Sequence, residues 1–187
     1  MNIPTGVVVT AAACIVAHAA WSQTPGAPYV PTPTAIVDRM LTLAKVGPGD
    51  YVVDLGSGDG RLVTTAVAKY KARGGMGVEL DGKLVKEANE NAARAGVADR
   101  VKFVQGDLFK ADVRDATVVT LYLLPGMLGD VEEKLAKELK PGTRVISHDY
   151  PLPSWKHVDV VAFDTQEKVP ISGTTRTVLL LYRVPSK

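Results

Sequence analysis

The chain has 187 residues, of which 46% are apolar and 22% carry a charge. These shares are close to those of ordinary globular proteins, and they exclude a largely disordered chain or a protein with many membrane spans. The net charge is +2, and the lysines and arginines are spread along the sequence, so nucleic acid is not an expected partner. The length suits one domain with a substantial core.

The first segment, residues 6–21, has the sequence GVVVTAAACIVAHAAW, and no charged side chain precedes Asp38. It is shorter than the roughly 20 apolar residues that span a bilayer, and the small-residue triplets at 17–19 and 20–22 resemble cleavage sites. The pattern predicts a signal peptide over residues 1–22. Because a positively charged start is missing, an uncleaved membrane anchor stays open as the alternative. We therefore expect an exported or membrane-associated protein, with its body facing the cytoplasm if the segment is an anchor.

A proline-rich segment follows at residues 23–34 and contains four prolines. Such a stretch favours an extended linker over a helix, and we expect its last part to fold over the ligand site as a lid. Thr34 is placed like the N-cap of an amphipathic helix at 35–46. The folded domain is predicted to comprise residues 35–187.

After this helix, apolar runs typical of strands alternate with stretches of helical periodicity. Strands joined by crossover helices indicate a mostly parallel, doubly wound sheet in an α/β fold, with helices on both faces. The last two runs, 158–165 and 175–184, are too close in sequence for a crossover helix and are predicted to form an antiparallel edge hairpin. The predicted parallel strands are 51–55, 75–80, 101–105, 116–123 and 143–149, and the predicted helices between them are 61–71, 83–95 and 128–139.

The strongest local signal is VVDLGSGDGR at residues 52–61, where an apolar strand runs into glycines and then a helix. In a doubly wound sheet this first turn is the usual place for a nucleotide. The spacing is G-x-G-x-G rather than the G-x-G-x-x-G of dinucleotide sites, and Asp54 and Asp59 bracket it. Two carboxylates repel a pyrophosphate but attract a cationic ligand, which favours S-adenosylmethionine over NAD. The candidate cofactor residues of this loop are Asp54, Gly56, Ser57, Gly58 and Gly60.

Further cofactor residues are predicted past the next strands. Glu79 ends the second strand, where a carboxylate accepts hydrogen bonds from both ribose hydroxyls, a feature that NAD sites share. Asp107 follows the third strand and is a candidate to bind the adenine amino group, or alternatively it only caps a turn. Leu108, beside it, and Thr32, a candidate for the methionine carboxylate, complete the cofactor set. The histidines show no metal-ligand spacing, so no metal is expected.

The motifs VVDLGSGDGR, GVEL at 77–80 and GDLF at 106–109 resemble the class I S-adenosylmethionine-dependent methyltransferases. More narrowly, YVPTPTAIVDRML at 29–41 and YPLPSW at 150–155 resemble the family that includes the ATP synthase C-subunit lysine N-methyltransferase and its small bacterial relatives. The resemblance implies a Rossmann-like seven-strand sheet, S-adenosyl-L-methionine as cofactor and a protein lysine as substrate. A small-molecule O- or N-methyltransferase and a non-catalytic cofactor-binding module stay open as alternatives.

The methyl acceptor is expected where the fourth and fifth strands end. A lysine acceptor must lose a proton, which costs roughly 4–5 kcal/mol at neutral pH, and burial in an apolar slot lowers that cost. Residues 121–125, LYLLP, offer such a slot with Tyr122 as its polar side chain, and they lack the acid and double proline of nucleobase-amine methyltransferases. Asp149 is the second candidate catalytic residue. Alternatively, Asp149 caps a turn and Tyr122 only packs.

Overall fold

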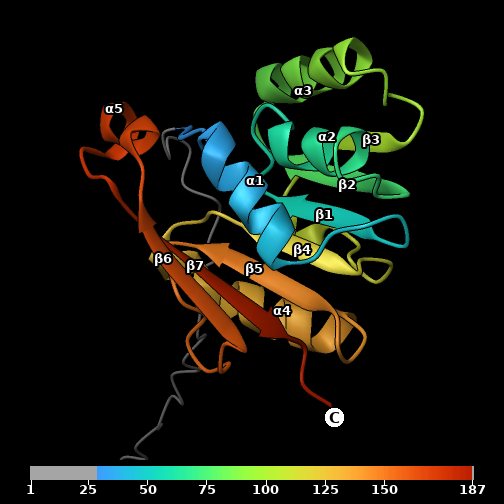
Figure 1. Cartoon of the computed structure of the whole chain (residues 1–187). Coiled ribbons are helices and arrows are strands. Elements are labelled where there is room, and N and C mark those ends of the chain that lie inside the picture. The colour runs from blue at the N-terminus through green and yellow to red at the C-terminus, as the bar shows by residue number, and fades with distance from the viewer. Residues whose placement is uncertain (1–28, 187) are drawn as a thin grey trace, which may run out of the picture.

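The structure is a computed structural model that describes residues 29–186. Figure 1 shows a central sheet with helices on both sides. The strands are β1 Tyr51–Leu55, β2 Gly74–Glu79, β3 Val101–Gln105, β4 Val118–Leu121, β5 Arg144–His148, β6 Asp159–Asp164 and β7 Arg176–Arg183. The helices are α1 Thr34–Leu43, α2 Arg61–Ala68, α3 Gly82–Arg94, α4 Leu128–Glu138 and α5 Val169–Ser172, with short 3-10 turns η1 Leu108–Lys110, η2 Pro125–Met127 and η3 Gln166–Lys168.

The seven strands lie in the order β3-β2-β1-β4-β5-β7-β6. The first five are parallel, and the strand order reverses between β1 and β4, where open α/β sheets bind their ligands. β7 lies between β5 and β6 and is antiparallel to both. The predicted doubly wound α/β fold, with seven strands and an antiparallel edge, is confirmed.

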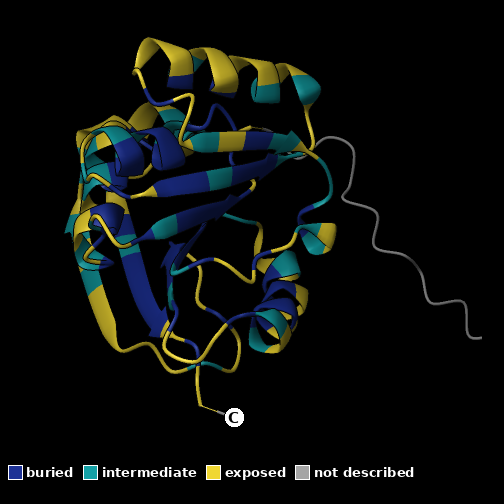
Figure 2. Ribbon diagram, turned by 90° about the vertical axis from the view of Figure 1, so that its right-hand side faces the viewer, coloured by how far each residue is buried: buried dark blue, intermediate teal, exposed yellow. Residues whose placement is uncertain are grey.

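Alternate strand residues face opposite layers of the fold. Val52 packs with the apolar residues of α1, α2 and α3, whereas the next residue, Val53, packs with those of α4. In Figure 2 the strands are mostly buried and the outer faces of the helices are exposed. Because helices pack on both faces of the sheet (Figure 1), the two ends of its parallel strands are left to form sites.

Two details differ from the sequence predictions. The connection between β6 and β7 contains η3 and α5, which were not predicted because a four-residue helix has no periodicity to detect. In addition, α1 begins at Thr34, so the predicted Thr34 N-cap is wrong by one residue. Pro33 occupies the cap position, and its carbonyl accepts hydrogen bonds from the backbone N–H groups of Ile36 and Val37.

The predicted localisation requires a correction. Across residues 29–186, no helix is long and apolar enough to cross a membrane. The prediction of an exported or membrane-associated protein is therefore wrong for the described part of the chain. Residues 6–21, on which that prediction rested, and the proposed signal peptide at 1–22 lie outside the described residues.

Candidate active site

The glycine loop after β1 makes a tight turn that brings backbone N–H groups to the end of β2. Gly56, Gly58 and Gly60 have φ angles of 81°, 51° and 76°, in the left-handed region that favours glycine. The N–H groups of Gly56 and Ser57 donate to the Val78 carbonyl at 2.9 and 3.0 Å. At Gly58, a side chain would also collide with the ring of Tyr29 from the proline-rich segment. The loop therefore depends on glycine for both its conformation and its packing.

Glu79 is held in a fixed position at the end of β2. Its Oε2 accepts a hydrogen bond from the Gly58 N–H at 2.9 Å, and its Oε1 accepts from the N–H groups of Leu80 and Asp81 at 2.7 and 3.0 Å. Three backbone donors thus orient the carboxylate. A carboxylate oxygen can accept more than one hydrogen bond, so the group can still accept from ligand hydroxyls.

Asp54 is a buried carboxyl at the end of β1, with 3% of its surface exposed. The Thr120 hydroxyl donates to Asp54 Oδ1 at 2.6 Å. Burial raises the pKa of Asp54 to about 7, and the negative charges of Glu79 and Asp59 add to this, while the Thr120 hydrogen bond opposes it. Without a ligand, Asp54 is poised to hold or release a proton near neutral pH.

Asp59 plays a different part from the one predicted from the sequence. Arg61 donates from Nε and Nη2 to the Asp59 carboxylate, with a shortest distance of 2.6 Å. Burial raises the pKa of Asp59, but the hydrogen bonds from Arg61 outweigh it and hold the pKa below its usual range. Arg61 Nη1 also donates to the Thr32 carbonyl at 2.9 Å, which fastens the proline-rich segment to the start of α2.

A cavity of about 760 Å³ lies at the carboxyl ends of the parallel strands, within the size range of small-molecule sites. It joins the glycine loop, the lid residues 29–32 and the residues that follow β3, β4 and β5. Five carboxylates and one cationic side chain, Arg61, line it within the described residues. The carboxylates are Asp54, Asp59, Glu79, Asp81 and Asp130.

The cavity brings together most of the residues singled out from the sequence, namely Thr32, Asp54, Gly56, Ser57, Gly58, Glu79, Leu108 and Tyr122. Three others do not line it. Gly60 caps α2 where a side chain would meet Phe103 and Ala88. Asp107 accepts a hydrogen bond from the Phe109 N–H at 2.9 Å and caps η1.

The third is Asp149, whose carboxylate is turned away from the cavity. Its Oδ2 lies 2.5 Å from the buried Lys168 ammonium, and its Oδ1 accepts from the Val178 N–H at 3.1 Å. Its role as a catalytic residue stays a prediction. Beside it, the buried His148 ring stacks against Tyr122 with the ring centres 4.0 Å apart.

Beyond the glycine loop, the cavity continues as a largely apolar slot. Leu123, Leu124 and Met127 line it together with the hydroxyl-bearing Tyr122 and Tyr150. Burial raises the pKa of Tyr122, and the nearby Asp149 and Tyr150 raise it further, so its hydroxyl stays protonated at neutral pH.

Asp130 also lines this slot and was not predicted from the sequence. It lies in the first turn of α4 and lines the cavity. Acidic residues are common in the first turn of a helix because they interact favourably with the helix dipole, so the sequence offered no separate reason to assign Asp130 to the site.

Residues 54–159 match the family described as the ANTKMT methyltransferase domain, over more than half of the chain. The chain belongs to this family. A protein-lysine N-methyltransferase of Saccharolobus islandicus (strain REY15A) is 44% identical over 140 residues, which cover 75% of this chain and 87% of that protein. The ATP synthase C-subunit lysine N-methyltransferase of Xenopus laevis is 35% identical over 163 residues, which cover 86% of this chain and 70% of that protein.

Among solved structures, this member of the ANTKMT methyltransferase family is similar to an RNA methyltransferase from Salinibacter ruber in complex with S-adenosyl-L-homocysteine. The TM-score is 0.75 with 46% sequence identity, and the match covers 84% of this chain and 95% of that one. The predicted resemblance to S-adenosylmethionine-dependent methyltransferases is confirmed. The chain is an enzyme of this class, and S-adenosyl-L-methionine is its cofactor.

Proposed function

We propose that this methyltransferase acts on the lysine side chain of a protein. The observation that carries the proposal is the 44% identity to a protein-lysine N-methyltransferase along 87% of that relative's length. The acceptor end of the cavity has the chemistry that a lysine needs, since an apolar slot disfavours the charged ammonium form and so lowers the lysine pKa.

We call the part of the cavity lined by the glycine loop, Glu79 and Leu108 the donor half, and the part lined by residues 122–130 the acceptor half. The residues of the donor half fit S-adenosylmethionine, which supplies an electrophilic methyl group on a cationic sulfonium. Asp54, Asp59 and Glu79 line this half of the cavity, and their carboxylates attract the positive charge of the sulfonium and of the amino group. Asp54 would hold the positive amino acid part and Glu79 the ribose hydroxyls. Leu108 would pack against the adenine, while Thr32 and the lid residues would exclude water.

The acceptor half aligns the incoming amine with the methyl group. Positioning alone supplies about 7–11 kcal/mol of the barrier in well-oriented reactions, so no strong base is required. In our proposal the Asp130 carboxylate attracts the charged lysine at the mouth of the slot, and the Tyr122 hydroxyl orients the neutral amine inside it. Of the two catalytic candidates from the sequence, Tyr122 lines the cavity, whereas Asp149 does not and is paired with Lys168.

A second candidate function is methylation of RNA. It is favoured by the similarity to the solved structure named as an RNA methyltransferase, at 46% identity. Against it, the residues after β4, LYLLP at 121–125, contain neither the acid nor the double proline typical of nucleobase-amine methyltransferases. The cavity wall also carries five carboxylates, which repel a phosphate backbone.

The experiment compares the two acceptors directly. The purified full chain is incubated with isotopically labelled S-adenosylmethionine and a cell extract, and both tryptic peptides and RNA nucleosides are analysed by mass spectrometry. Labelled methyl-lysine in a peptide is the expected result, and it should be absent with the Asp54→Asn variant. Label in nucleosides alone would favour RNA. Release of S-adenosylhomocysteine without label in either fraction would indicate a small-molecule acceptor. Cofactor binding without release of S-adenosylhomocysteine would indicate a non-catalytic binding module.

A further inference from the structure

A second cavity lies at the opposite end of the sheet, where the parallel strands begin. Its volume is about 470 Å³. It is bounded by the end of α1, the start of β2, the segment before β4, the turn before β5 and the end of β7. Five cationic side chains and one carboxylate, Asp115, line it within the described residues. The cationic residues are Lys45, Arg73, Lys140, Arg144 and Arg183.

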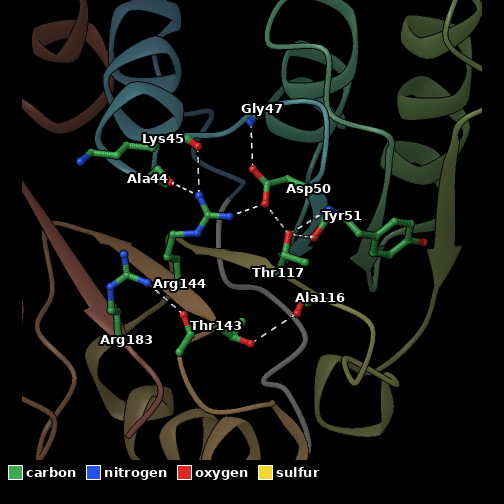
Figure 3. Close-up of polar contacts among 11 residues, drawn as sticks. Ala44, Lys45, Gly47, Asp50, Tyr51, Ala116, Thr117, Thr143, Arg144 and Arg183 are labelled. Atoms are coloured by element: carbon green, nitrogen blue, oxygen red, sulfur yellow. Dashed lines mark hydrogen bonds and ion pairs between the residues drawn. The ribbon is translucent and has the colours of Figure 1, made fainter.

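Arg144 lines this cavity, and several polar contacts hold its guanidinium in place (Figure 3). Its Nη1 donates to the carbonyls of Ala44 and Lys45 at 2.6 and 3.0 Å, and so caps the end of α1. Its Nη2 pairs with the Asp50 carboxylate. Asp50 is itself held by the Gly47 N–H at 2.8 Å and the Thr117 hydroxyl at 2.7 Å. The guanidinium therefore has one orientation, which is fixed before any ligand arrives.

The other cationic side chains are free to turn toward a ligand. Lys45, Arg73 and Lys140 are exposed and form no ion pair within residues 29–186. Arg73 lines the cavity, and its guanidinium carbon lies 5.0 Å from the centre of the Tyr51 ring. Arg183 donates one long hydrogen bond, 3.3 Å, to the Gly142 carbonyl.

The balance of charge suggests the valence of a ligand. Asp50 and Asp115 each offset one cation. The ends of α1 and α4 next to the cavity each carry about half a negative charge from the helix dipole. Together these offset about three of the five cations, so roughly two positive charges are left. Gathering like charges without a counterion costs stability, and a dianion removes that cost.

We infer that this cavity binds a phosphate dianion, either free or carried by a small molecule. Arginine and lysine side chains are the usual donors to phosphate oxygens, and arginine adds directional hydrogen bonds. The volume of about 470 Å³ and the Asp115 carboxylate among the lining residues favour a small ligand over an extended polyanion. The site is independent of the methyltransferase reaction, because it lies at the amino ends of the strands whose carboxyl ends form the active site.

Titration calorimetry with inorganic phosphate on the full chain, at low ionic strength, tests the inference. Arg73→Ala and Lys140→Ala should each weaken phosphate binding about tenfold, and the double variant about a hundredfold, as expected for charge-assisted hydrogen bonds. Asp115→Asn should tighten binding. Lys86→Ala, on the exposed face of α3, is the matched control and should leave it unchanged. All of these variants should bind S-adenosylmethionine like the wild type, which shows that they are folded.

Two results would overturn the inference. One is a wild type that fails to bind phosphate, or that binds it no more tightly than the Arg73→Ala, Lys140→Ala double variant. Equal binding by these two proteins would indicate an adventitious ion only. The other is a short single-stranded RNA, or a vesicle of anionic lipid, that binds through these same residues while inorganic phosphate does not compete with it. That result would assign the cavity to a polyanionic surface instead.

Discussion

The two ends of the sheet carry opposite charge. Among residues 29–186, five carboxylates and one guanidinium line the larger cavity at the carboxyl ends of the parallel strands. At their amino ends, five cations and one carboxylate line the smaller cavity. In each cavity one ion pair neutralises a wall residue, Asp59 with Arg61 in the larger and Asp50 with Arg144 in the smaller. The two ends of the parallel strands can therefore offer separate sites to a cationic cofactor and to an anionic ligand.

The two ion pairs also differ in what they hold. Arg61 donates a hydrogen bond to the Thr32 carbonyl of the lid, so we expect its loss to affect ligand binding. Arg144, at the start of β5, contacts the end of α1 and pairs with Asp50, which precedes β1. We therefore expect its loss to lower the stability of the fold. Substitutions at the two ends should therefore separate folding from cofactor binding.

The largest effect is expected for Arg144→Ala. This change leaves Asp50 buried without its partner and removes the hydrogen bonds to the α1 carbonyls, and breaking a buried pair typically costs about 3–5 kcal/mol. The free energy of unfolding, measured by urea denaturation, should fall by about that amount. Arg183→Ala, in the same cavity but with a single long hydrogen bond, is the control and should cost less than about 1 kcal/mol. Equal losses for both variants would contradict the role of the Asp50 pair.

The next effect concerns Asp54→Asn. It removes the buried negative charge from the donor half and should weaken S-adenosylmethionine binding at least about a hundredfold, or about 2.7 kcal/mol. An asparagine oxygen can keep the Thr120 hydrogen bond, so the fold should survive. Titration calorimetry checks this, with Asp81→Asn as a control on an exposed carboxylate of the same cavity. Unchanged affinity in Asp54→Asn would remove Asp54 from the cofactor site.

The same carboxyl should make the empty protein less stable as the pH rises. Its native pKa of about 7 lies above its ordinary value of 3.8, so between these values the native state holds a proton that the unfolded state has lost. Stability from this group is therefore present at low pH and is lost as the pH rises from about 4 to about 7, by about 4 kcal/mol at most. Above pH 7, Asp54→Asn should unfold at a higher denaturant concentration than the wild type.

Cofactor binding should depend on pH with the opposite sign. A cationic ligand needs Asp54 ionised, so below about pH 7 the affinity should fall about tenfold per pH unit, and above about pH 8 this dependence should level off. Calorimetry across this range, with the Asp54→Asn variant as a pH-insensitive reference, measures the effect. A flat profile in the wild type would show that Asp54 does not face the ligand.

The smallest effect is expected for Asp130→Asn, which should affect binding of the methyl acceptor but not binding of the cofactor. Loss of a charge at the mouth of the slot should raise KM for a lysine-containing peptide about fivefold, or about 1 kcal/mol, without changing cofactor affinity. Asp149→Asn is the informative contrast, since it leaves the buried Lys168 unpaired and should lower stability rather than raise KM. The opposite pattern would restore Asp149 to the active site and exclude Asp130.

The fold and the donor half of the site were predictable because their signals are local. The glycine spacing, Asp54 and Glu79 each follow from one strand and the turn after it. The acceptor half was less predictable. Asp149 follows the expected strand, but its side chain is captured by Lys168 from the connection between β6 and β7, which local sequence does not place. The basic cavity was not predictable at all, because Arg73, Lys140 and Arg183 are far apart in sequence and only the sheet brings them together.

The decisive measurement compares methyl transfer by two variants, one from each end of the sheet. With labelled S-adenosylmethionine and a protein extract, the wild type and Lys140→Ala should produce the same methyl-lysine peptide at similar rates, and Asp54→Asn should produce none. Methyl transfer that survives in Asp54→Asn, or label that appears in RNA and never in lysine, would contradict the assignment of the acidic cavity to lysine methylation.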